Sequence, residues 1–149
     1  SEPTVALRLD ELVLGCVEEF RLAGADVETV DLAAVTYPCR PVALKRALRN
    51  LIENAVRYGK EARVSVADEA DSVALAVADA GPSLPEDRMD EAFQPFVRLE
   101  ASRNTETGGI GLGLAIARSI VQAHGGTLTL ENRREGGLVA TIRLPKTAA

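Results

Sequence analysis

Two asparagines and two arginines recur at helical spacing near the middle of the sequence. Asn50, Asn54 and Arg57 lie three or four residues apart, so in an α-helix they share one face, which Arg46 extends by one turn. Amide oxygens are hard ligands suited to Mg²⁺, and guanidinium groups suit phosphate. Asparagine is a poor helix former, so its repetition within a helix favours a functional reason. A metal and phosphate site is one interpretation of this face, and a solvated helix surface is the other.

A single carboxylate stands at the end of an apolar run. Asp79 follows the strand expected over Ser72–Ala78 and is separated from Gly81 by one residue. A carboxylate in this place can accept a hydrogen bond from an exocyclic amine such as that of adenine. Glycine lets the backbone approach a flat ligand closely. Taken alone, the pattern is more typical of an ordinary strand-end turn.

A glycine-rich run over residues 107–114 leads directly into the helix expected over Leu112–His124. Exposed backbone N–H groups and the positive end of the helix dipole favour phosphate at such a place. The spacing is neither the dinucleotide fingerprint nor a P-loop. We therefore expect phosphate binding here, with a flexible hinge as the alternative.

Residues 84–109 form a long irregular connection, which is usually functional or mobile in a compact domain. Phe93 and Phe96, two of the three phenylalanines, are expected to anchor the base of a mobile segment that runs from about 97 to 108. Arg98 and Arg103 would reach a terminal phosphate when that segment closes, although exposed arginines are common.

The surrounding elements indicate a two-layer α/β sandwich. Asp10 is expected to cap the first helix and Gly59 to end the second. Helical periodicity covers three segments, Asp10–Ala23, Pro41–Tyr58 and Leu112–His124, with a short helix near Asp87–Ala92. Strand patterns cover Val5–Leu9, Glu28–Leu32, Ala62–Ala67, Ser72–Ala78, Thr127–Glu131 and Leu138–Leu144.

Composition narrows the function classes. The 149 residues suit one domain, 1–149, and the abrupt start at Ser1 suggests a piece of a larger protein. A net charge of −5 argues against a nucleic-acid surface but allows a nucleotide, which needs few local cations. Cys16 and Cys39 lack metal-ligand spacing, and we expect two buried free thiols, with a disulfide left open. No apolar run approaches a membrane span, so we expect no direct membrane contact.

Taken in order, these four places resemble the N, G1, F and G2 boxes of the histidine-kinase catalytic domain. This domain belongs to the wider ATPase group that includes gyrase, the MutL repair proteins and the heat-shock chaperone ATPases. The resemblance runs from about Leu12 to Pro145 and is strongest over residues 50–55 and 109–117. It implies a Bergerat-type fold, a mixed sheet of about five strands covered on one face by three helices, with ATP under a mobile lid.

The resemblance implies a role for each matching residue. Asn54 corresponds to the Mg²⁺ ligand and Asn50 to a second amide near the metal and the phosphates. Asp79 corresponds to the carboxylate that reads the adenine amine. No catalytic residue is expected outside the ATP site, in which Arg57 and Arg98 are the candidates. The other residues implied in nucleotide binding are Arg57, Tyr58, Gly81, Arg98, Arg103, Gly109, Gly111, Leu112 and Gly113.

Three positions depart from the relatives' patterns. Ser83, after Pro82, replaces the second glycine of the G1 box, and Ile110 replaces the commoner threonine of the G2 box. The hydrolysing relatives carry a glutamate at the position of Asn50, as general base for water. A neutral amide cannot accept a proton usefully at pH 7, and Glu53 is a weak substitute because it lies about 60° around the helix. The resemblance therefore favours phosphotransfer over hydrolysis.

The only histidine, His124, is expected to cap the end of the last helix rather than to accept phosphate. In the family the acceptor histidine lies on a helical dimerisation domain, which we expect to be separate from this chain. The implied activity is binding of Mg·ATP and donation of its γ-phosphoryl group to that histidine, for onward transfer to a response regulator. The implied location is the cytoplasmic part of a kinase bound to the inner membrane. A hydrolysing ATPase, an anti-sigma-type serine kinase and a non-binding pseudokinase scaffold remain the alternatives.

Overall fold

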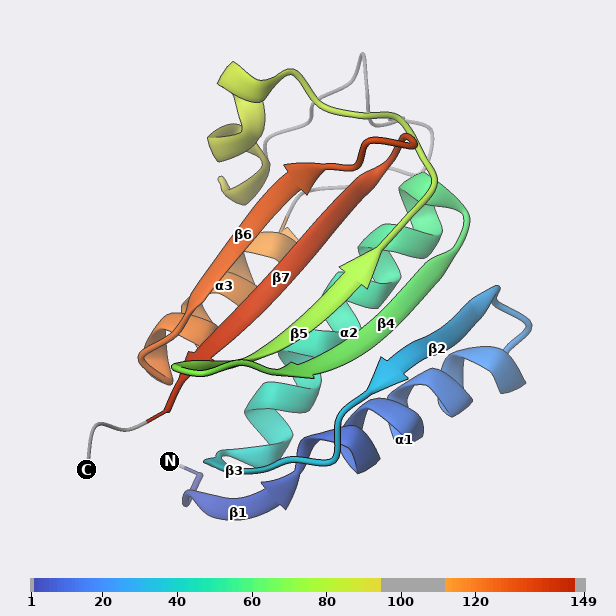
Figure 1. Cartoon of the computed structure of the whole chain (residues 1–149). Coiled ribbons are helices and arrows are strands. Elements are labelled where there is room, and N and C mark those ends of the chain that lie inside the picture. Colours follow the sequence, from blue (N-terminus) through green and yellow to red (C-terminus); the bar gives the residue numbers. More distant parts are fainter. Residues whose placement is uncertain (1, 95–111, 147–149) are drawn as a thin grey trace.

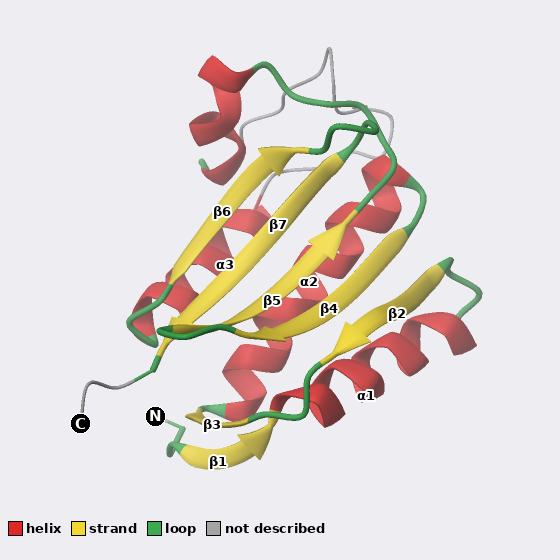
Figure 2. Ribbon diagram, in the orientation of Figure 1, coloured by secondary structure: helices red, strands yellow, loops and turns green. Residues whose placement is uncertain are grey.

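The computed structural model describes residues 2–94 and 112–146. A five-stranded sheet forms one layer, with the strand order β2-β4-β5-β7-β6 (Figure 1). Strand β2 runs parallel to β4, whereas every other neighbouring pair is antiparallel, so the sheet is mixed (Figure 2). The strands are β2 (Val27–Leu32), β4 (Ala62–Asp68), β5 (Ser72–Ala78), β6 (Thr127–Asn132) and β7 (Leu138–Pro145).

Three helices cover the same face of the sheet, which confirms the predicted two-layer α/β architecture (Figure 1). They are α1 (Leu9–Leu22), α2 (Pro41–Gly59) and α3 (Leu112–Ala123), and a 3₁₀ helix, η1 (Glu86–Phe93), follows β5. The apolar stripe of α2 faces the sheet, and four of its residues are at most 3% exposed. These are Leu44, Leu48, Leu51 and Ala55. Aliphatic packing therefore fixes α2 over the sheet.

A small second sheet closes one end of the molecule. Strand β1 (Val5–Arg8) pairs with β3 (Thr36–Cys39) in antiparallel fashion. The sequence did not predict β3, because four residues that include Pro38 carry too little of a strand pattern. The Tyr37 hydroxyl donates a hydrogen bond of 2.5 Å to the carbonyl oxygen of Pro145, which ties this sheet to the end of β7.

The predicted cap at Asp10 is wrong, and α2 ends at Gly59 as predicted but for a different reason. Asp10 lies inside the first turn of α1, where it pairs with Arg8 (Nη2 to Oδ2, 2.6 Å) instead of capping the helix. The hydrogen bond from Arg8 lowers the pKa of the Asp10 carboxyl. Helix α2 continues through Gly59, and Lys60 adopts the left-handed conformation beyond it, with φ of 66°. Gly59 must therefore be a glycine for another reason.

Side chains distant in sequence hold the N-terminus of α2. The Glu2 carboxylate accepts hydrogen bonds from the backbone N–H groups of Val42 (2.6 Å) and Ala43 (3.0 Å). His124 Nε2 accepts one from the N–H of Arg40 (3.1 Å), and its Nδ1 lies 2.8 Å from the carbonyl oxygen of Ile120. This pairing suits a neutral imidazole with its proton on Nδ1. His124 therefore joins the end of α3 to the start of α2.

No helix within residues 2–94 and 112–146 is long and apolar enough to cross a membrane. Cys16 on α1 and Cys39 on β3 are buried free thiols, as the sequence predicted.

The buried thiols give a test of this packing. Burial raises the pKa of Cys16 to about 11 and raises that of Cys39 as well. Because the thiolate is the reactive form, we expect Cys16 in the folded protein at pH 8 to react with a disulfide reagent about a hundredfold more slowly than in the unfolded chain, and Cys39 also to react more slowly. Reaction of the same sample in concentrated urea is the control, and rapid modification of either thiol in the folded protein would contradict the prediction.

Candidate nucleotide-binding site

The site forms where the end of α2, the end of β5 and the turn between β6 and β7 meet. Asp79 follows β5 directly, and its side chain is almost fully buried, with the residue 3% exposed. Its Oδ1 accepts hydrogen bonds from the backbone N–H groups of Gly81 (2.9 Å) and Leu138 (3.1 Å). The Asp79 N–H donates in turn to the carbonyl oxygen of Leu138 (2.9 Å). Two backbone N–H groups therefore orient this carboxylate, and the Leu138 carbonyl holds the backbone that carries it.

Glycines allow the three segments to approach at backbone distance. A Cβ on Gly59, at the end of α2, would lie closer than 3.0 Å to the Asp79 side chain. A Cβ on Gly137 would lie equally close to the Asp79 carbonyl, and one on Gly81 would lie 2.6 Å from the carbonyl oxygen of Tyr58. Such contacts essentially never occur for real Cβ atoms. Each glycine is therefore required by the close packing around Asp79.

The loop after Asp79 is pinned to β6 by one side chain. Asn132 Oδ1 accepts a hydrogen bond from the N–H of Leu84 (3.0 Å), and its Nδ2 donates to the carbonyl oxygen of the same residue (2.8 Å). Leu84 is itself buried in the core, whereas Pro82 and Ser83 are exposed. The Asn132 amide thus provides the two hydrogen bonds that a neighbouring strand would otherwise make with Leu84, and it holds the loop beside Asp79.

The middle of α2 packs against the first turn of α3. A Cβ on Gly113 would lie 3.7 Å from the Asn50 Cβ, so the two helices are close at this point. Asn50 Nδ2 is buried and has no hydrogen-bond partner among the described residues. An unsatisfied buried donor costs about 1–3 kcal/mol, which an anionic oxygen of a ligand would offset. Asn50 and the N-terminal turn of α3 together therefore suit phosphate.

Residues 39–148 match the family model described as histidine kinase-, DNA gyrase B-, and HSP90-like ATPase. The chain belongs to this ATPase family. Sensor histidine kinase GtrS of Pseudomonas aeruginosa is 47% identical over 135 residues, which make up 91% of this chain but 28% of GtrS. The chain thus spans less than a third of this curated relative.

Solved structures of histidine kinase ATP-binding domains share the fold. The ATP-binding domain of PrrB from Mycobacterium tuberculosis superposes with a TM-score of 0.80 at 26% identity, covering 99% of this chain and all of that one. Histidine kinase ThkA, solved in complex with the response regulator protein TrrA, gives a TM-score of 0.78 at 26% identity over 97% of this chain and 42% of that chain.

The structure brings together part of the predicted ATPase site. Asp79, Gly81, Tyr58 and the end of α2 lie around one point, and Asn50 lies against Gly113. Asn54 is half-buried on α2, whereas Arg57 is exposed. Leu112 begins α3. The predicted residues outside the described part of the chain are Phe96, Arg98, Arg103, Gly109 and Gly111, with the predicted lid.

One aromatic anchor is confirmed. Phe93, at the end of η1, is 5% exposed. The Arg118 guanidinium of α3 lies over its ring at 4.4 Å from the centroid, a cation–π contact. Phe93 therefore joins η1 to α3.

Sequence reasoning missed the side chains and glycines that position Asp79 from other elements. They are Gly59, Asn132, Arg133, Gly137 and Leu138. Gly59 was predicted only as the end of a helix, and the glycine pair at the β6–β7 turn also suits an ordinary hairpin.

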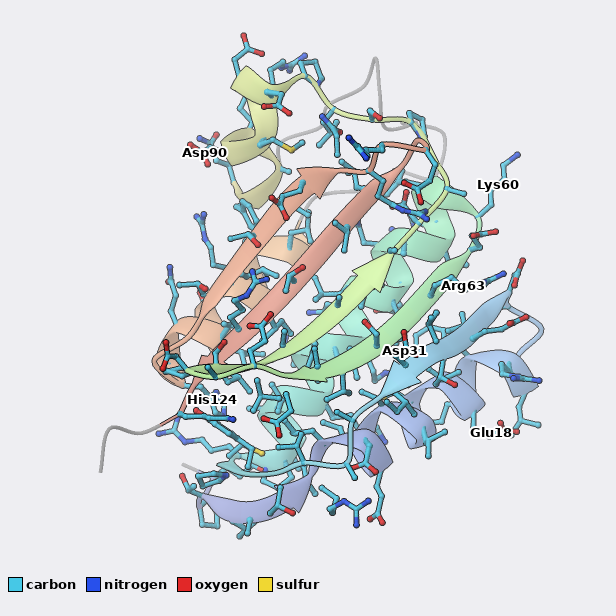
Figure 3. The ribbon with its side chains drawn as sticks, viewed as in Figure 1. Glu18, Asp31, Lys60, Arg63, Asp90 and His124 are labelled. Atoms are coloured by element: carbon cyan, nitrogen blue, oxygen red, sulfur yellow. The ribbon has the colours of Figure 1, made fainter. Side chains whose placement is uncertain are left out.

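His124 lies away from this site. Figure 3 places Lys60, next to Gly59, and His124 at opposite ends of the molecule. Both His124 ring nitrogens have hydrogen-bond partners in the packing of α2 and α3. These contacts agree with a structural role for this histidine.

The described residues also suit the divalent cation that the family implies. They contain no group of three or more His, Cys, Asp or Glu side chains that could hold a metal alone. Mg²⁺ commonly takes one or two protein ligands and completes its shell with water and phosphate oxygens. Amide oxygens, which Asn54 and Asn50 both carry, are among the ligand types that such a shared shell uses.

The close packing predicts a contrast between two helical glycines. Gly59→Ala places a methyl group against Asp79, so we expect a loss of about 1–3 kcal/mol in the free energy of unfolding and weaker nucleotide binding. Gly15→Ala is the matched control, because nothing lies within 4 Å of its added Cβ on α1. We expect it to stabilise the protein by about 0.5–1 kcal/mol. Equal effects of the two substitutions in urea unfolding would contradict the packing argument.

Proposed function

We propose that the chain binds Mg·ATP and donates the γ-phosphoryl group to a histidine on a separate helical dimerisation domain of a sensor kinase. A response regulator then receives the phosphoryl group from that histidine. The observation that carries the proposal is the buried, backbone-locked Asp79 carboxylate at one end of α2, with the buried Asn50 amide further along the same helix.

The spacing along α2 suits an extended nucleotide. Asn50 and Gly59, which packs on Asp79, are separated by roughly 14 Å at the helical rise per residue. This span is comparable with the length of an extended nucleoside triphosphate. Adenine would therefore lie at Asp79, beside Gly81 and the half-buried Tyr58, while the phosphates extend toward Asn50 and the start of α3.

The residues at the phosphate end of the proposed site would supply positive charge and hydrogen-bond donors that orient the phosphates. Gly109, Gly111, Leu112 and Gly113 would offer backbone N–H groups at the start of α3. Arg57, Arg98 and Arg103 would neutralise phosphate charge. Asn54, with Asn50, would hold Mg²⁺, which when bound neutralises charge on the transferring phosphoryl group. The chain's own residues thus orient ATP and stabilise developing negative charge.

The residue at position 50 favours phosphotransfer over hydrolysis. Asn50 is neutral and lies against α3, so it cannot take a proton from an attacking water. Glu53, the adjacent carboxylate on α2, is exposed. The nucleophile therefore comes from a partner, in keeping with the separate acceptor domain.

Adenine selectivity tests the role of Asp79. Asp79→Asn keeps an oxygen that can accept from Leu138 and Gly81, but it replaces the other carboxylate oxygen with a donor. We expect ATP affinity to fall tenfold or more, about 1.5–3 kcal/mol, with little change in thermal stability. GTP should bind poorly to the wild-type protein, because its six-position carries an acceptor. Equal ATP affinity of the two proteins in calorimetry would refute the assignment.

A labelling experiment tests the proposed transfer. We expect no transfer of labelled phosphate from ATP to this chain alone and ATP hydrolysis near background. Addition of the helical dimerisation domain as a separate chain should produce label on its histidine. A helical domain with that histidine replaced by glutamine is the control.

Two results would overturn the proposal. One is stable phosphorylation of His124, and the other is rapid hydrolysis by the isolated chain that is lost in Glu53→Ala.

A further inference from the structure

Arg133 reaches Asp79 from the turn between β6 and β7. Its Nη1 donates a hydrogen bond to the backbone carbonyl oxygen of Asp79, across 54 residues of sequence. The side chain is 24% exposed, and Nη2 lies 3.4 Å from Glu135 Oε2 at the surface. The guanidinium therefore contacts the backbone carbonyl of Asp79 in the site and the exposed carboxylate of Glu135 at the surface.

The turn that carries Arg133 is braced by its own backbone. The Arg133 N–H donates to the carbonyl oxygen of Gly137 (2.9 Å), and the Gly136 N–H donates to that of Arg133 (3.1 Å). Gly136 and Gly137 have φ of 101° and 93°, values that favour glycine. The base of the arginine side chain is thus fixed before the guanidinium extends to Asp79.

The contact from Arg133 holds the backbone that carries the Asp79 carboxylate. Asp79 is the first residue beyond β5, whose last registered pair with β7 is Ala78 with Val139. Its peptide is fixed by Leu138 at the N–H and by Arg133 at the carbonyl. Because the Cα–Cβ bond follows the backbone, fixing both groups fixes the point from which the carboxylate extends to the N–H groups of Gly81 and Leu138.

We propose that Arg133 is a positioning residue for adenine recognition, acting through Asp79 rather than by touching the nucleotide. The inference rests on the proposed reading of adenine by Asp79. Loss of the guanidinium leaves a buried carbonyl without this donor and lets the end of β5 shift. Discrimination between six-amino and six-oxo purines would then fall, while binding of the common triphosphate would not.

The test compares binding of ATP and inosine triphosphate, which carries an oxygen in place of the adenine amine. We expect Arg133→Ala to weaken ATP binding about tenfold and to leave inosine triphosphate binding unchanged. Arg134→Ala is the matched control, because it removes the same charge from the same turn at an exposed position. It should alter either affinity by no more than about twofold. Arg133→Lys keeps one donor and should retain part of the discrimination.

The outcomes separate this inference from the proposed function. If the wild-type protein binds both triphosphates equally, or Asp79→Asn retains discrimination, adenine reading by Asp79 fails and the inference fails with it. If Asp79→Asn loses discrimination but Arg133→Ala keeps it, only the role of Arg133 is wrong. An equal loss of both affinities in Arg133→Ala, or the same losses in Arg134→Ala, would indicate a general structural or charge effect and would also overturn it.

Amide hydrogen exchange keeps the inference testable if Arg133→Ala does not fold. The Leu138 and Gly81 N–H groups report directly on Asp79 Oδ1. In Arg133→Lys we expect both to exchange faster than in the wild-type protein and in Arg134→Ala, with other β7 amides unchanged. Unchanged exchange at both amides, together with full discrimination in Arg133→Lys, would overturn the inference.

Discussion

The close approach of three backbone segments around Asp79 is the constraint on which the site depends. The last turn of α2, the end of β5 and the start of β7 meet where Gly59, Gly81 and Gly137 leave no room for a Cβ. Since no side chain separates these three segments, any shift of α2 relative to the sheet would also displace the Asp79 carboxylate. The geometry of a polar site is therefore set by apolar packing elsewhere.

Helix α2 carries that constraint along its length. Its buried stripe contributes about 1.5–3 kcal/mol for each large aliphatic side chain, so Leu44, Leu48 and Leu51 together outweigh the cost of about 1–3 kcal/mol for the unsatisfied amide of Asn50. Glu2 and His124 bind backbone N–H groups at the first turn of the helix, and the Asp79 side chain packs against Gly59 in its last turn. The apolar packing of α2 is therefore stable enough to tolerate the polar side chains on its other face.

The sequence predicts what local pattern controls and misses what depends on tertiary contact. The periodicity of α2, the strand patterns of β4 and β5 and the position of Asp79 were all evident from neighbouring residues. Gly59 was predicted as a helix stop, but its requirement comes from Asp79, 20 residues away, and Lys60 takes the left-handed position instead. The hydrogen bond from Arg133 to Asp79 leaves no local signal. Most of the phosphate side of the predicted site stays a prediction, because residues 95–111 lie outside the described structure.

The proposed separation of the nucleotide site from the nucleophile agrees with the same packing. The sole histidine has both ring nitrogens engaged between α2 and α3, at the other end of the molecule from Lys60 (Figure 3). Freeing it for chemistry would remove an acceptor from the N-terminus of α2, whose placement determines the site itself. Under the proposed function, the neutral amide of Asn50 would not activate water at the phosphate side of the site. The proposed ATP site would then gain its reactivity from a histidine on a partner domain, and the timing of transfer would depend on how that domain is presented.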